Sequence, residues 1–151
     1  MSTKQPRISA TSVGILALCG ALMLAACAGD PKARSAERFA RGEQYFTDGK
    51  LDEAIIELRG AIQLDPMAGR ARYRLAEAYA RKNDPQSAFG EFVRAADLLP
   101  DDVAVQQSAG DVLLLARRYE EARARAERVI ALDPKGTAGL VLLGNAQSGL
   151  G

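Results

Sequence analysis

The chain has 151 residues, of which 48% are hydrophobic, 26% are charged and 5% are aromatic, and its formal net charge is +1. This length suits one domain, and this hydrophobic content excludes an intrinsically disordered chain. The small net charge gives no indication of nucleic-acid binding, and the absence of histidine removes the commonest general base and the commonest neutral metal ligand.

The N-terminus has the pattern of a targeting segment. Lys4 and Arg7 precede an apolar run over residues 13–26 that contains no charge. Its 14 residues suit the apolar core of a signal peptide, whereas a spanning helix needs about 20. The run ends in Leu24-Ala25-Ala26-Cys27, which resembles the bacterial lipobox. We therefore expect residues 1–26 to be a lipoprotein signal peptide; a plain small-residue cleavage site, or a short anchor with an incidental cysteine, is the alternative.

The lipobox resemblance implies a lipid at Cys27, which would become the mature N-terminus and carry covalent diacylglycerol and acyl chains. Two or more chains hold a protein stably on a membrane. In such proteins an aspartate after the cysteine favours retention in the inner membrane. Ala28 stands there instead, which favours an outer membrane facing the periplasm if the envelope has two membranes. Residues 27–34 are then the lipidated cysteine and a short tether, and no cofactor other than this lipid is expected.

From residue 35 onward, apolar and small residues recur every three or four positions, which predicts helices. We expect the first pair at 35–48 and 51–64, and a last helix at 137–150. Turns are predicted at Gly49-Lys50, at Asn83-Asp84 and near Arg117-Arg118. Three sets of residues recur at a spacing of 34, namely Ala54, Ala88 and Ala122; Pro66, Pro100 and Pro134; and Gly42, Ala76, Gly110 and Gly144.

A period of 34 with these small residues and prolines resembles the tetratricopeptide repeat family. Large residues (Tyr45, Tyr79 and Leu113) also match it, although the tryptophan often found in the first helix is replaced by Arg38, Arg72 and Gln106. The resemblance implies an all-α, right-handed solenoid of helix–turn–helix units that binds other proteins. Its repeats would span residues 35–68, 69–102 and 103–136, followed by the first helix of a fourth repeat over 137–151.

The last predicted helix, 137–150, contains no charged residue, although a terminal helix of a solenoid should present a polar outer face. It would expose some of Val141, Leu142, Leu143 and Leu150. We expect that the chain is a fragment, or that the natural protein continues with more repeats. A poorly soluble end helix, or one that docks on a partner, is the alternative.

Catalytic patterns are missing from the sequence, which has no glycine-rich phosphate loop and no cluster of metal ligands. The acidic pairs Asp101-Asp102 and Glu120-Glu121 fit helix N-termini, where carboxylates are favourable. Arginines from Arg117 to Arg128 alternate with glutamates, which indicates a solvated, salt-bridged helix face. We therefore predict a protein without enzymatic activity, without a metal and without a nucleic-acid partner.

The candidate binding surface is a groove lined by the first helix of each pair. Helical spacing assigns ten residues to it, which are Phe39, Glu43, Phe46, Arg70, Tyr73, Arg74, Glu77, Arg81, Gln107 and Asp111. Its arginines offer bidentate forks for carboxylates, and tyrosine offers an anchoring surface. Alternatively, the arginine stems cover neighbouring helix surface. Members of the family that bind chaperone tails use a set of lysine, asparagine and arginine side chains. In this chain the positions expected for that set hold Phe39, Glu43, Ala104 and Ser108. Chaperone tails are therefore not the expected partner.

These patterns together predict a non-enzymatic scaffold or adaptor of the bacterial cell envelope, anchored by the lipid on Cys27 and binding a protein or peptide. The alternative is the N-terminal repeat part of a larger envelope machine. A lipobox followed by such repeats is similar in architecture to components of exopolysaccharide export, pilus assembly and outer-membrane assembly.

Overall fold

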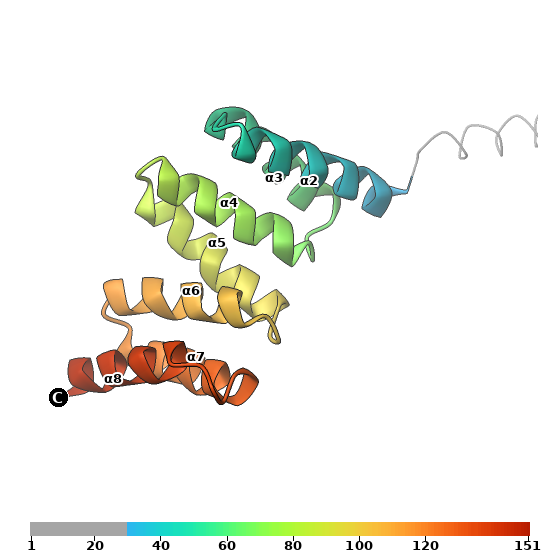
Figure 1. The fold of residues 1–151 in the computed structure, drawn as a ribbon. Helices are drawn as coiled ribbons and strands as arrows, with labels where there is room; N and C mark the ends of the chain where they lie inside the picture. The colour runs from blue at the N-terminus through green and yellow to red at the C-terminus, as the bar shows by residue number, and fades with distance from the viewer. Residues whose placement is uncertain (1–29) are drawn as a thin grey trace, which may run out of the picture.

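The computed structural model describes residues 30–151, which form a stack of seven α-helices (Figure 1). They are α2 (Pro31–Thr47), α3 (Leu51–Leu64), α4 (Gly69–Arg81), α5 (Pro85–Leu98), α6 (Val103–Leu115), α7 (Tyr119–Leu132) and α8 (Ala138–Leu150). Each helix packs against the next, from α2 and α3 at one end to α7 and α8 at the other. The prediction of an all-α helical repeat fold is confirmed.

The predicted signal peptide, the lipobox and Cys27 lie outside the described residues. Within residues 30–151, no helix is both long enough and apolar enough to cross a membrane.

The first helix begins at Pro31, four residues earlier than expected. The Asp30 carboxylate accepts a hydrogen bond from the backbone N–H of Lys32 at 3.1 Å, and Pro31 has the fixed φ that suits the first helical position. Residues 31–34 are exposed, so apolar periodicity could not reveal them, but the Asp-Pro pair is itself a helix-start signal. The last four residues of the predicted tether therefore belong to α2.

Each first helix of a pair ends in the same left-handed turn. The turn residues are again 34 apart, and their φ angles are 76° at Gly49, 58° at Asn83 and 58° at Arg117. The next backbone N–H in each turn donates across it at 2.9 Å, from Lys50 to Tyr45, from Asp84 to Tyr79 and from Arg118 to Leu113. This arrangement satisfies carbonyls that a helix end would otherwise leave unpaired. Of the three, only Arg117 is a residue type that rarely adopts this conformation.

We expect Arg117→Gly to raise the free energy of unfolding by about 1 kcal/mol. A left-handed conformation costs a residue with a Cβ roughly 1–2 kcal/mol, which glycine avoids. The greater backbone entropy of glycine in the unfolded chain reduces this gain. Urea denaturation measures this difference. Gly49→Ala, at the equivalent turn, is the matched control and should lower stability by about the same amount. A lower stability of Arg117→Gly would show that contacts of the Arg117 side chain outweigh the backbone strain.

Glycine permits close packing at two helix crossings, one between α2 and α3 and one between α6 and α8. A Cβ at Gly42 would lie 2.8 Å from the Leu58 side chain, and one at Gly110 would lie 2.3 Å from the Leu142 side chain. At Gly144 a Cβ would meet nothing within 4 Å. The equivalent glycines thus differ sharply in the space around them, although their sequence spacing is identical.

The last helix exposes much apolar surface, as predicted. Val141 is 61% exposed and Leu140 is 58% exposed, while Leu150 is also exposed. Leu142, which was among the residues expected at the surface, is buried, because it fills the space beside Gly110 on α6.

The first helices of the pairs lie closer together than the second helices do. Among the described helices, α2 lies against α4 and α6 lies against α8, while α4 meets α6 through Tyr73 and Ser108. The second helices do not approach one another in this way, although the Arg125 side chain of α7 reaches Asp97 on α5. The first helices therefore line the inner face of the curved stack, which is the face assigned to the groove.

Candidate functional site

Neighbouring helix pairs contact each other along the inner face. The contact between the first and second pairs is here called the first interface, and that between the second and third pairs the second interface. Arg74 closes the first interface. Its Nη2 donates to Glu43 Oε2 on α2 at 3.0 Å, and its Nη1 donates to Glu77 Oε2 on α4 at 2.6 Å. The hydrogen bond to Glu43 raises the pKa of the Arg74 guanidinium above its ordinary value. With two carboxylates already bound, Arg74 fastens α4 to α2 and is not free to bind a partner's carboxylate.

Phe46 lies beneath this cluster rather than on the groove surface. Only 5% of it is exposed, and the guanidinium carbons of Arg74 and Arg81 lie 4.6 Å and 3.9 Å from its ring centroid. Arg74 and Arg81 therefore cover the Phe46 ring, and its part in a partner-binding surface stays a prediction. Helical spacing placed it on the inner face correctly, but the neighbouring repeat covers that part of the face.

Tyr73 joins the second pair to the third. Its hydroxyl lies 3.2 Å from Ser108 Oγ on α6, and its ring meets Phe92 edge-on with centroids 5.7 Å apart. Arg70 is more open, because its side chain is 74% exposed and its ion pair with Asp102 is 3.4 Å long. Surface ion pairs of this kind contribute little stability, so Arg70 can exchange Asp102 for another anion.

The remaining groove residues are spread along the inner face. Phe39 packs against the core of the first pair, and Gln107 is half-buried on α6. Asp111 is exposed on α6, yet partial burial raises the pKa of its carboxyl. A raised pKa from burial marks a carboxylate that a partner's cation would stabilise.

An apolar pocket at the second interface was not predicted. It has a volume of about 470 Å³ and lies between the turn after α4, the first half of α5 and the end of α6. Its walls include Ala80, Pro85, Phe89, Phe92, Val112 and Leu115. Leu115 is 84% exposed at its edge. An exposed leucine beside an apolar hollow is the kind of surface that marks a binding site.

The pocket exists because one repeat position carries a small residue. Phe46, Ala80 and Leu114 are successive copies of that position, 34 residues apart. Phe46 fills the first interface, and Leu114 packs against the core of the third. Ala80 leaves the corresponding space of the second interface open. Comparing residues 34 apart would have revealed this difference in the sequence.

Other polar residues singled out in the sequence have structural roles. Asp102 caps α6 by accepting from Val105 N at 3.3 Å, and Glu120 and Glu121 stand in the first turn of α7, as predicted. Arg118 and Arg123 form the expected ion pairs along α7. Arg125, however, reaches Asp97 on α5 at 2.6 Å, so part of this face joins two repeats.

The three residues that replace the usual tryptophan each bind a residue 19 positions later. Arg38 donates to Glu57 at 3.2 Å and Arg72 donates to Glu91 at 2.9 Å. In the third pair the direction of donation is reversed, because Gln106 accepts from Arg125 at 3.1 Å. Within residues 30–151, no group of three or more histidine, cysteine or acidic residues is placed to hold a metal ion.

Residues 38–103 match a family described as tetratricopeptide repeat, and no curated protein matches the chain. Among solved structures, the chain is similar to the first TPR of Spaghetti (RPAP3) bound to the HSP90 peptide SRMEEVD, with 24% identity over 79% of this chain and 94% of that one and a TM-score of 0.66. The first TPR domain of human RPAP3 is 25% identical over 78% of this chain and 92% of that one, with a TM-score of 0.61. MamA protein is 22% identical over 77% and 63% of the two chains, with a TM-score of 0.66.

Proposed function

Because residues 38–103 belong to the tetratricopeptide repeat family, we propose that this protein is a non-enzymatic scaffold that holds a protein or peptide partner at the bacterial cell envelope. The inner face of the stack receives the partner. The lipid on Cys27 holds the scaffold on the membrane, and Ala28 favours the outer membrane facing the periplasm.

The observation that carries this proposal is the apolar pocket at the second interface. Its counterpart at the first interface holds the Phe46 ring, which shows that the repeat geometry accommodates an aromatic side chain there. A bulky apolar side chain of the partner would fill the space that Ala80 leaves open. Such side chains, buried in pockets, provide most of the affinity of protein interfaces.

The charges around the pocket indicate the charge that the partner segment should carry. Asp111 lies one helical turn before Leu115 on the same face of α6, so a lysine or arginine beside the partner's apolar side chain would pair with it. The similar RPAP3 structure binds an acidic HSP90 peptide. In this protein Glu43 and the already paired Arg74 occupy the inner face of the first interface, so an acidic tail would meet a carboxylate there. We therefore propose an apolar and basic partner segment.

Crosslinked capture from envelope membranes tests the scaffold function. The full chain and its Cys27→Ser variant are expressed equally, and crosslinked partners are identified by mass spectrometry. The native chain should capture a defined partner from membranes, and the variant should lose at least about 90% of it, since one lost anchor removes the local concentration that tethering supplies. Equal capture by both chains would refute the anchored scaffold, and the mass of the purified native protein reports lipidation separately.

A further inference from the structure

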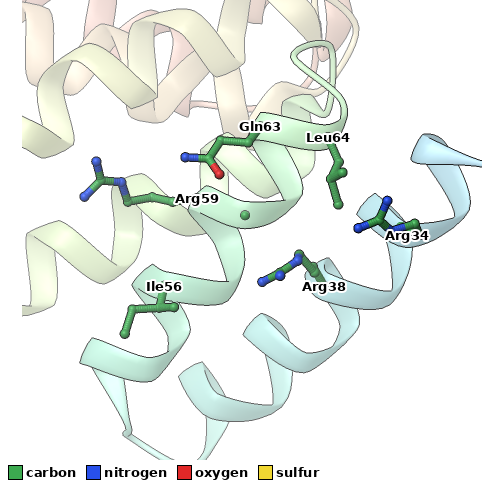
Figure 2. A pocket seen from close by; sticks show the side chains of 7 residues that line it. Arg34, Arg38, Ile56, Arg59, Gln63 and Leu64 are labelled. Atoms are coloured by element: carbon green, nitrogen blue, oxygen red, sulfur yellow. The ribbon is translucent and has the colours of Figure 1, made fainter. Parts of the chain in front are cut away.

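An open, cationic groove lies between the start of α2 and the end of α3, at the end of the stack where the described chain begins. It has a volume of about 490 Å³, and Arg34, Arg38, Ile56, Arg59, Gln63 and Leu64 line it. Figure 2 shows Arg34 and Arg38 on α2 reaching toward α3, which carries Arg59 and Gln63. A Cβ at Gly60 would lie 2.7 Å from Arg38 Nη1, so this glycine lets the guanidinium rest against α3.

Positive charge in this groove is not balanced. Arg38 donates to Glu57, but between residues 30 and 151 no acidic side chain forms an ion pair with Arg34 or Arg59. Lys32 and Arg34 also stand in the first turn of α2, which contains no acidic residue. Cations there oppose the helix dipole. These positions therefore favour a ligand that brings negative charge.

Two of the cations, Arg34 and Arg59, are specific to the first pair. Arg34 corresponds to Ala68 and Asp102 in the second and third pairs, and Arg59 corresponds to Val93 and Glu127. In the later pairs the preceding repeat also covers this side, since Arg72 donates to Pro66 O and Gln106 donates to Leu99 O. Arg125 and Arg128 line a comparable groove of the third pair, but they are paired with Asp97 and Asp101. Within residues 30–151, the groove of the first pair is the one lined by arginines without acidic partners.

We propose that this groove rests on the phosphate headgroups of anionic phospholipids. Guanidinium groups bind phosphate with two parallel hydrogen bonds, and Ile56, which is 65% exposed, would enter the boundary with the acyl chains. The inference rests on the proposed lipid anchor, because Cys27 stands four residues before Pro31 and can be at most about 14 Å from it. At that distance the arginines can enter the surface potential of the membrane, which decays over about 8 Å.

Amide hydrogen exchange of the full chain in lipid nanodiscs tests this orientation. One set of discs contains phosphatidylcholine only, and the other contains phosphatidylcholine with one quarter phosphatidylglycerol. We expect amides of α2 and α3 to exchange at least about five-fold more slowly on the anionic discs, with α7 and α8 unchanged, because the potential acts only near the surface. The difference should vanish in 0.5 M NaCl and in the double variant Arg34→Gln/Arg59→Gln. Arg94→Gln/Arg123→Gln makes the same charge change on α5 and α7 and should retain it.

Three outcomes would overturn the proposal. Equal exchange on both kinds of disc would show that the groove does not contact headgroups, and loss of protection in the α5–α7 control would reduce the effect to net charge. The same protection by millimolar inorganic phosphate without discs would identify a site for free phosphate instead. The comparison uses protein whose mass shows a lipid on Cys27 and needs no captured protein partner, so failure here is distinct from failure of the scaffold proposal.

Discussion

Replacing Gly110 by leucine is expected to lower the free energy of unfolding by about 3 kcal/mol, the upper part of the range for overpacking a core. A Cβ at this position would lie 2.3 Å from one methyl carbon of Leu142, and the rest of a leucine side chain would need space that α8 occupies. Leu142 is itself buried, so it cannot turn into solvent without losing its own packing. Thermal unfolding should show a midpoint lower by roughly 10 °C.

Gly144→Leu is the matched control for that substitution. It stands 34 residues later in the same repeat position, but a Cβ there would have no neighbouring atom within 4 Å. A leucine at this position should raise stability by up to about 1 kcal/mol, since glycine is a poor helix former. Equal destabilisation by both substitutions would show that loss of glycine itself, rather than the contact with Leu142, limits the fold.

Replacing Ala80 by phenylalanine is expected to abolish capture of the partner while making the protein more stable. The new ring would occupy the apolar pocket as Phe46 occupies the first interface, covering Leu115 and excluding a partner's side chain. Burial of the ring against Phe89 and Phe92 should add about 1 kcal/mol to the free energy of unfolding. Capture from membranes and urea denaturation, measured on the same preparation, separate the two effects.

Ala131→Phe adds the same side chain at an exposed position of α7 and controls for non-specific binding by an exposed aromatic ring. It should leave capture unchanged. Normal capture by Ala80→Phe, with the stability gain present, would exclude the pocket as the anchoring site. A loss of stability would instead show that the second interface cannot adopt the geometry of the first.

The repeat fold could be predicted because local signals agree along the chain. Small residues at a spacing of 34 fix where helices cross, and Asn83-Asp84-Pro85 combines a left-handed turn, a cap and a first helical proline. The start of α2 was placed too late because residues 31–34 are exposed and carry no apolar periodicity. A capping signal at Asp30 decides that boundary.

The site was harder to predict, because spacing gives the face of a helix but not what covers that face. Phe46 and Arg74 do point to the inner side, yet the neighbouring pair covers the Phe46 ring and supplies one of the two carboxylates that bind Arg74. The pocket arises because the small side chain of Ala80 stands where the first and third repeats carry a large one. Such a gap becomes visible only when the copies are compared with one another.

The reversed polar pair of the third repeat has a consequence for how the chain folds. Arg125 binds Asp97, and Arg128 donates to Pro100 O at 3.0 Å and binds Asp101, so the third repeat carries cations that match acids on the second. If the third repeat docked on the first by mistake, Arg125 would face Gln63 and Arg128 would face Met67. Misassembly of similar units is a common failure of repeat proteins. These charges therefore favour the second repeat over the first as the neighbour on which the third repeat docks.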